Sequence, residues 1–314
     1  MSTPLTPRAR QITAQLDLSA PGLEIGPSYN PLVPKSSGVP VQTVDHATRE
    51  ELVDKYRRWG HTDELLDRID EVDHIWTGGS LVETIGTTHG FGWIIGAHIV
   101  EHQVDLVGFL QDCSALLTSE GRAAFAVPDM RQTFDLISPL TTLGMVVDRH
   151  LLTGTPFHNP GAVLDAYAHQ VRKGGTPAWD LPIPGELTLT HSDWAPSLEA
   201  FERAKAQDEY LDIHRWVFTP LSFQILMQEL FEVGLTDLRL IGPIAQRGHE
   251  FHVTLSRTGP GPSADRIQLY RQLLASQAAA FTAALETDPA RPSPVHRTAS
   301  RGRRWARSLR RVRG

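Results

Sequence analysis

The stretch that decides the fold is Leu23-Glu24-Ile25-Gly26-Pro27-Ser28-Tyr29-Asn30. A short apolar run with one acidic residue breaks at a glycine into a turn-rich loop. A buried parallel strand ends in this way where its carboxyl edge opens onto a ligand crevice. A second strand end follows at Val41-Gln42-Thr43-Val44-Asp45, and its closing carboxylate can reach a pair of ribose hydroxyls. The two ends predict a nucleotide-type cofactor held over a parallel sheet, with helix capping as the alternative role for Asp45.

The composition indicates one globular domain that can carry an inserted subdomain. The chain has 314 residues, of which 40% are hydrophobic, enough for a packed core. No apolar run approaches the roughly 20 residues that cross a bilayer, and residues 1–20 lack a signal-peptide core. The single cysteine, Cys113, excludes a disulfide framework and a cysteine-based zinc site. We therefore predict a cytoplasmic protein.

The basic residues are distributed unevenly. Nine of the 30 lysines and arginines are arginines within residues 291–314, a segment with no acidic residue, so the remainder is strongly acidic. We expect a disordered, solvated tail, with weak contact to an anionic surface as the alternative. The remainder has no basic patch with interleaved aromatic residues, so we do not expect sequence-specific binding of nucleic acid.

Strand and helix patterns alternate through residues 23–129. Thr48 and Glu51 form a capping-box pattern at the start of a helix. Buried strands at Phe91–Ala97 and after Gly121 flank a helix over 105–117, whereas 69–75 is a weaker strand candidate. The alternation predicts an α/β fold with a doubly wound, mostly parallel sheet.

The C-terminal part of the domain completes this sheet. Thr219 and Pro220 begin a helix, and strand patterns follow at 238–241 and 251–255. The connection between them is too short for a crossover helix, so they form an antiparallel hairpin, which makes seven strands in all.

Residues 130–215 interrupt the alternation. This segment is rich in Pro, His, Trp and Thr, with helical patterns near 160–172 and 195–206. We predict a mainly helical insertion that caps the crevice and recognises the substrate. The predicted boundaries are 1–258 for the main domain, 259–290 for a linker and C-terminal helix, and 291–314 for the basic tail.

Five parallel-type strands closed by a hairpin resemble the class I S-adenosylmethionine-dependent methyltransferase fold, which is Rossmann-like. Glu24-Ile25-Gly26 looks like the first motif of that family, and Asp45 stands where its ribose-binding acid would be. Ala97-His98-Ile99-Val100-Glu101-His102 resembles the end of the fourth strand in its small-molecule branch. The resemblance covers about 23–129 and 219–255. It implies S-adenosyl-L-methionine as the cofactor, with five binding residues: Glu24, Gly26, Asp45, Gly78 and Ala97.

The first loop departs from the usual Gly-x-Gly-x-Gly of the family. It has one glycine and resembles the Gly-Pro-Ser-x-Asn-Pro loop of a small-molecule or saccharide branch. Pro27 lacks an N–H, and Tyr29 adds bulk. If either fills the crevice, the chain is a non-catalytic relative that keeps the fold as a binding or scaffold module. An NAD(P)-dependent oxidoreductase is a further alternative, disfavoured because Gly-x-Gly-x-x-Gly is missing.

Methyl transfer to a hydroxyl or an amine needs a base beside the acceptor. His98 is the first candidate, because it follows the fourth strand and an imidazole titrates near neutrality. Asp129 and His150 are the next candidates. Arg131 either clamps an anionic substrate group or pairs with Asp135 at the turn.

The string His98-x-x-Glu101-His102 is also the inverted zinc-peptidase signature when it lies on a helix. Here it follows a strand directly, and no downstream motif announces a third ligand, so we predict no metal site. Glu101 and His102 are then hydrogen-bonding residues at the strand end. The predicted function is O- or N-methylation of a small molecule or a saccharide by in-line transfer; the oligomeric state is left open.

Overall fold

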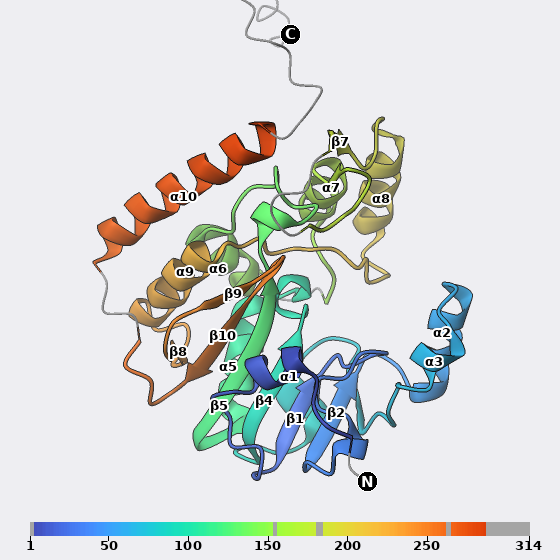
Figure 1. The fold of residues 1–314 in the computed structure, drawn as a ribbon, viewed down its shortest axis with the longest axis vertical. Helices are drawn as coiled ribbons and strands as arrows, with labels where there is room; N and C mark the ends of the chain where they lie inside the picture. The colour runs from blue at the N-terminus through green and yellow to red at the C-terminus, as the bar shows by residue number, and fades with distance from the viewer. Residues whose placement is uncertain (1–2, 153–155, 180–184, 262–264, 287–314) are drawn as a thin grey trace, which may run out of the picture.

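The computed structural model describes residues 3–152, 156–179, 185–261 and 265–286 (Figure 1). The arginine-rich segment 291–314 lies outside these residues. In the described part, eight strands form one sheet in the order β3-β2-β1-β4-β5-β10-β8, and β9 pairs with β10. The strands are β1 (Gly22–Ile25), β2 (Val41–Asp45), β3 (His74–Ile75), β4 (Phe91–Ala97), β5 (Leu117–Pro128), β8 (Arg239–Leu240), β9 (Ala245–Arg247) and β10 (Glu250–Ser256).

The strand directions give a Rossmann-like, doubly wound α/β sheet. β1 to β5 pair in parallel, whereas β10 is antiparallel to both β5 and β8. The predicted C-terminal antiparallel pair is therefore confirmed. The order reverses between β1 and β4, and in open α/β sheets ligands bind outside the carboxyl ends of the strands at such a switch point.

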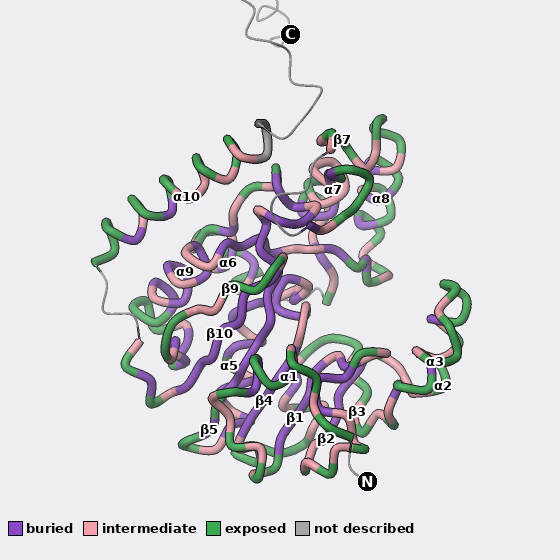
Figure 2. Tube along the Cα trace, viewed as in Figure 1, coloured by how far each residue is buried: buried purple, intermediate pink, exposed green. Residues whose placement is uncertain are grey.

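Side chains on β4 alternate between two cores, because successive residues of a strand point to opposite faces. Ile94 packs with the helices of one face, whereas Trp93 and Ile95 pack on the other face. Figure 2 shows the resulting buried centre of the sheet. The first face is covered by four helices: α4 (Leu81–Ile85), α5 (Leu106–Leu116), α6 (Leu143–Leu151) and α9 (Pro220–Glu232).

The second face is covered more thinly, by α1 (Pro7–Ile12) and the loop residues Leu32 and Val33. The prolines between Gly26 and Pro40 explain this, because they prevent a long helix from following β1. Only the short 3-10 turn η1 (Lys35–Ser37) forms there. After β2, the capping box of Thr48 and Glu51 begins α2 as predicted. Helices α2 (Arg49–Arg58) and α3 (Asp63–Leu66) share a separate hydrophobic cluster.

The structure departs from the sequence prediction at several elements. The strand expected over 69–75 is reduced to His74–Ile75. The connection between β8 and β10 contains a further strand, β9, which pairs with β10. Helix α6 was not predicted, and its residue Val146 belongs to the main core, so part of 130–215 covers the sheet.

The regular elements that the structure describes in 130–215 are mainly helical, as predicted, with one short pair of strands in addition. Helices α7 (Pro160–Ala168) and α8 (Ala195–Ala206) share a separate core, and β6 (Val171–Lys173) pairs with β7 (Leu187–Leu189). The last described helix, α10 (Arg266–Glu286), packs on α9 through Leu269 and Leu273. Within the described residues, none of the helices is long and apolar enough to span a membrane.

Candidate functional site

Three of the predicted site residues lie in one row at the carboxyl edge of the sheet. Ile25 of β1 pairs with Val44 of β2 and with Gly96 of β4. The next residue along each strand is therefore Gly26, Asp45 or Ala97. The three residues flank the switch point, where the strand order predicts a ligand crevice.

Gly26 has a backbone that other residues rarely adopt, with a φ of +66°. Its N–H donates to Val44 O at 2.8 Å, which continues the sheet by one bond. A Cβ at this position would lie 3.0 Å from Ile99 Cγ2. Both the positive φ and this close approach favour a residue without a side chain. Gly26 therefore turns the chain sharply out of β1.

Glu24 lies behind the loop that follows β1 and is almost fully buried. Its two carboxylate oxygens accept hydrogen bonds from the backbone N–H groups of Leu32 and Val33, at 2.6 and 2.9 Å. Burial raises the pKa of Glu24 to about 7, although these two donors oppose the shift. Its contacts in this structure thus hold the returning end of the loop.

Asp45 connects the end of β2 to the same loop. Its Oδ2 accepts the Ser28 N–H at 2.9 Å, and its Oδ1 accepts the N–H and the ring Nδ1 of His46, at 2.8 and 2.7 Å. A carboxylate has about four acceptor positions, so one remains after these three donors.

Tyr29 packs into an aromatic cluster with Tyr56 and His61. Its ring lies 4.7 Å, centroid to centroid, from both Tyr56 of α2 and His61. Ser28 contacts the same Tyr56 hydroxyl. The bulk of Tyr29 therefore fills a cluster beside α2 and α3, while Pro27 is buried within the loop.

Gly78 lies in the exposed loop after β3, with a φ of +119°. The same loop contains Trp76. Its backbone N–H donates to Asp45 O at 2.8 Å, and its ring stacks on Phe109 at a centroid distance of 6.3 Å. The indole Nε1 donates to Gly79 O at 3.1 Å. The backbone of Trp76 therefore lies beside the end of β2, and its half-buried indole packs against Phe109 of α5.

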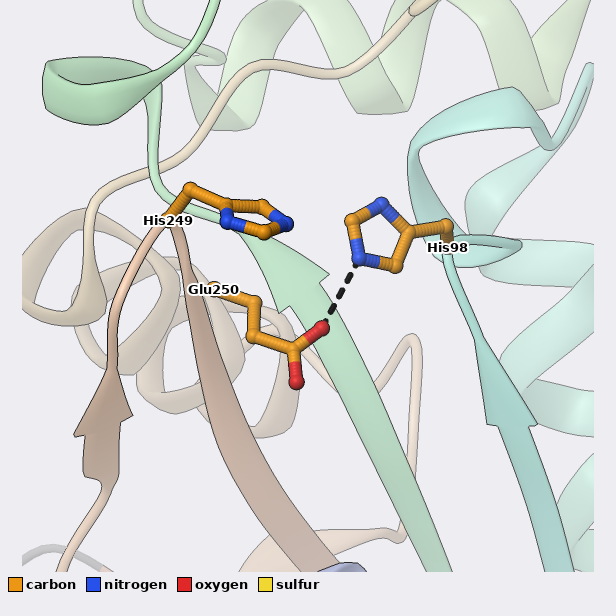
Figure 3. A group of neighbouring side chains, drawn as sticks. All are labelled: His98, His249 and Glu250. Atoms are coloured by element: carbon orange, nitrogen blue, oxygen red, sulfur yellow. Dashed lines mark hydrogen bonds and ion pairs between the residues drawn. The ribbon is translucent and has the colours of Figure 1, made fainter. Parts of the chain in front are cut away.

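His98 follows β4 directly and has a left-handed backbone, with a φ of +54°. Its Nε2 lies 2.9 Å from Glu250 Oε2, and its ring lies 6.0 Å from that of His249 (Figure 3). Arg8 binds Glu250 through two hydrogen bonds of 2.8 and 2.7 Å, and His252 adds a further one at 2.9 Å. These donors hold the pKa of Glu250 well below its usual range despite burial. Glu250 thus fixes the imidazole of His98 at the end of β4.

Asp129 is fully buried. Its carboxylate accepts bonds from the Arg131 guanidinium and from Gln246 Nε2, the latter at 3.0 Å. Arg131 therefore pairs with Asp129 rather than with Asp135, contrary to the predicted turn pairing. Because the Asp129 carboxylate is buried and paired with Arg131, it is not open to the methyl acceptor of a substrate.

A second group of ionisable side chains lies just beyond His98. Glu101 is 1% exposed, and neither of its carboxylate oxygens has a hydrogen-bond partner among the described residues. The nitrogens His98 Nδ1, His102 Nε2 and His214 Nε2 lie 3.5, 3.8 and 4.0 Å from its Oε1. Three imidazoles thus surround one buried carboxylate.

The outer nitrogens of two of these imidazoles are held by carboxylates. His102 Nδ1 lies 2.8 Å from Asp212, and His214 Nδ1 lies 2.6 Å from Asp135. The imidazole of His102 lowers the pKa of Asp212 to about 2. Burial lowers the pKa of His102, but the carboxylates of Asp212 and Glu101 outweigh burial, and the net shift is upward.

The sequence analysis identified His98, Glu101 and His102 but did not place His214 beside them. Glu101 and His102 lie in the 3-10 turn η2 (Val100–His102), not in the helix that the inverted zinc-peptidase signature requires. The backbone N–H groups of Arg215 and Trp216 donate to Glu101 O, at 2.8 and 3.1 Å, and so place His214 there. His214 and Glu101 are more than a hundred residues apart in the chain, so no local sequence pattern predicts their contact.

Comparisons with known proteins add little to this geometry. No protein-family model matches the chain, and no curated protein sequence matches it. A methyltransferase from Aquifex aeolicus, described as SAM dependent, is 12% identical over 80% of this chain and 89% of its own, with a TM-score of 0.38. The glycopeptide N-methyltransferase MtfA, solved with sinefungin, is 13% identical over 82% and 98%, also with 0.38.

A further solved structure has a different description. It is described as a Zn-dependent alcohol dehydrogenase from Rhodobacter sphaeroides, is 12% identical over 82% of this chain and 92% of its own, and has a TM-score of 0.42. Scores below 0.5 at these identities carry no argument about activity. The fold assignment rests on the strand order itself.

Proposed function

We propose that this chain is an S-adenosyl-L-methionine-dependent methyltransferase that methylates an oxygen or nitrogen of a small molecule or a saccharide. The observation that carries the proposal is the strand order, in which the antiparallel β10 lies between β5 and β8 and the order reverses between β1 and β4. The sequence resemblance to class I methyltransferases supports the same activity.

The residues at the switch point fit this cofactor. Gly26 turns the chain away without a side chain, and Asp45 keeps one acceptor position for a ribose hydroxyl. The backbone of Trp76 lies beside the end of β2, and we assign the indole face opposite Phe109 to the purine. Ala97 ends β4, which pairs with β1, and Gly78 lies in the loop after β3; both positions leave room for a ligand. We assign Glu24 an indirect role, because its oxygens hold the loop residues Leu32 and Val33.

The bound cofactor would supply a methyl group made electrophilic by a sulfonium. The part of the chain in the reaction is to position the acceptor and remove its proton. His98 is suited to this role, because Glu250 holds its Nε2 and the ring orientation is fixed. Nδ1, the nitrogen that would take the proton, lies 3.5 Å from Glu101 Oε1, so the carboxylates of Glu250 and Glu101 would both stabilise the imidazolium that forms. Asp129, which is paired with Arg131, does not enter this proposal.

Helices α7 and α8 form the proposed acceptor-recognition element, because they share a core that is separate from the core of the sheet. The proposal is tested by incubating the full chain with S-adenosyl-L-methionine and a panel of hydroxylated and amino-bearing small molecules and saccharides. Release of S-adenosylhomocysteine is followed by mass spectrometry. Acceptor-dependent release supports the proposal, and a folded protein that neither binds the cofactor nor releases product contradicts it.

A further inference from the structure

We propose that Glu101, His102 and His214 bind a divalent transition-metal ion of the Zn²⁺ type. The three residues offer one carboxylate oxygen and two imidazole nitrogens, and these ligand atoms lie within 4.8 Å of one another. The inference goes beyond methyl transfer and stands without it, because it rests only on the arrangement of these side chains.

The first argument is the state of Glu101. A buried carboxylate without hydrogen bonds is strongly unfavourable unless another charge compensates for it. Neither of its oxygens has a hydrogen-bond partner within the described residues, although three imidazoles surround it. By contrast, Glu250 in the neighbouring group accepts bonds from Arg8, His98 and His252. The two groups differ in that Glu250 is satisfied and Glu101 is not.

The second argument is the direction of the imidazole lone pairs. In a neutral imidazole whose Nδ1–H faces Asp135, as in His214, the Nε2 atom carries a lone pair. Nδ1 of His102 lies 2.8 Å from the Asp212 carboxylate, an ion-pair contact on the outer side of that ring. The Nε2 atoms of both imidazoles face Glu101 Oε1, and a metal ion bound between them would make this arrangement favourable. In metal sites, a carboxylate commonly binds the outer nitrogen of a ligating histidine and so fixes the orientation of the ring.

The third argument is distance. The 3.8 and 4.0 Å separations from Glu101 Oε1 to His102 Nε2 and His214 Nε2 are too long for hydrogen bonds. With metal–ligand bonds of about 2.1 Å, two ligand atoms of a tetrahedral zinc ion lie roughly 3.4 Å apart. The observed separations exceed this value by half an ångström or so. The three ligand atoms all lie within 4.8 Å of one another, so an inward movement of the side chains would complete the coordination.

The ligand set also selects the class of metal. Two imidazoles and one carboxylate favour zinc and its neighbours among the divalent transition metals, whereas Mg²⁺ and Ca²⁺ prefer oxygen ligands alone. Three protein ligands leave at least one coordination position for water or another molecule, as in catalytic sites. The His102 side chain is 25% exposed, so the site has access to solvent.

The test is a calorimetric titration of the tag-free full chain with Zn²⁺ after dialysis against a chelator, with Mg²⁺ titrated in parallel. We expect one Zn²⁺ per chain, bound at least 100-fold more tightly than Mg²⁺. Glu101→Gln and His214→Asn should each weaken Zn²⁺ binding at least tenfold. The matched control is His150→Asn. His150 is also 25% exposed and lies 2.9 Å from a carboxylate, Asp105, but is not part of the ligand group.

Folding of each variant is checked by thermal unfolding with and without Zn²⁺, since a ligand of the native state raises Tm. Should Glu101→Gln not fold, Asp135→Asn decides, because it keeps all three ligands and removes only the carboxylate that orients His214. It should weaken Zn²⁺ binding about tenfold or more. The proposal is overturned if the wild type binds no Zn²⁺, if Mg²⁺ binds equally well, or if the ligand variants bind Zn²⁺ as the wild type does.

Discussion

The backbone N–H of Ser28 donates a hydrogen bond of 2.9 Å to the carboxylate of Asp45, which lies 17 residues further along the chain. The bond joins the loop after β1 to the end of β2. The same carboxylate is the proposed partner of the cofactor ribose. Loop shape and cofactor binding are therefore coupled through one side chain, and a substitution at Asp45 must separate the two effects.

Asp45→Asn should weaken binding of S-adenosylhomocysteine by about 10- to 100-fold. The amide oxygen can still accept the Ser28 N–H, but a charged hydrogen bond, worth about 1.5–3 kcal/mol, is lost. The measurement is calorimetric titration, with Asp54→Asn as the control, because the Asp54 side chain on α2 is 72% exposed. Equal affinity in Asp45→Asn and wild type would remove Asp45 from the cofactor site.

Gly26→Ala should destabilise the protein more than Gly38→Ala. Both glycines have a positive φ, +66° and +79°, so the backbone penalty of about 1 kcal/mol is shared. A Cβ at position 26 would also press on Ile99, 3.0 Å away, whereas at position 38 it meets no atom within 4 Å. Urea unfolding of the two variants measures the difference. A smaller loss of stability for Gly26→Ala than for Gly38→Ala would show that Ile99 moves aside without cost.

Glu24 should make folding stability depend on pH between about 4.5 and 7. Its pKa in the folded state, raised by burial to about 7, exceeds the value of 4.5 for an exposed glutamate. The native state then holds a proton that the unfolded state releases, so the contribution is fully present below pH 4.5 and is lost as pH rises to 7. The loss is on the order of 3 kcal/mol. The measurement is the unfolding free energy of wild type minus that of Glu24→Gln at each pH, which isolates the contribution of the Glu24 carboxyl. A difference that is constant with pH would contradict the prediction.

His98→Asn should preserve the fold and lower the rate of methyl transfer by about 10²- to 10⁴-fold, the usual contribution of a general base. Asparagine tolerates the left-handed backbone at this position. The control is His89→Asn, because His89 has a similar φ, +52° against +54°, and lies before β4 rather than after it. Turnover is measured with an acceptor identified in the panel. A similar rate for the two variants would exclude His98 as the base.

Much of the sheet could be predicted from the sequence, because the central strands are buried on both faces and therefore form continuous apolar runs. The bounds of β2 and β4 agree with the predicted ones, and Thr48 and Thr219 cap their helices as expected. β3 and β9 were less accessible to prediction. They are two or three residues long and partly exposed, so neither shows a hydrophobic pattern.

The candidate site was predictable only where one strand end defines it. Gly26, Asp45 and Ala97 each follow an apolar run directly, so their position at the carboxyl edge follows from the strands. The partners of Asp129 and Glu101 depend instead on how residues 130–215 fold back. The backbone N–H groups of Arg215 and Trp216 bond to Glu101 O and so bring His214 close to Glu101. Hydrophobic periodicity in the sequence does not predict these bonds.

The central claim is that the crevice between β1, β2 and β4 binds S-adenosyl-L-methionine. The most direct measurement is calorimetric titration of the folded wild-type chain with S-adenosyl-L-methionine and, separately, with S-adenosylhomocysteine. We expect micromolar binding of both ligands at one site per chain, weakened in Asp45→Asn but not in Asp54→Asn. No binding of either ligand by a protein with an intact unfolding transition would contradict the claim and leave the fold as a scaffold.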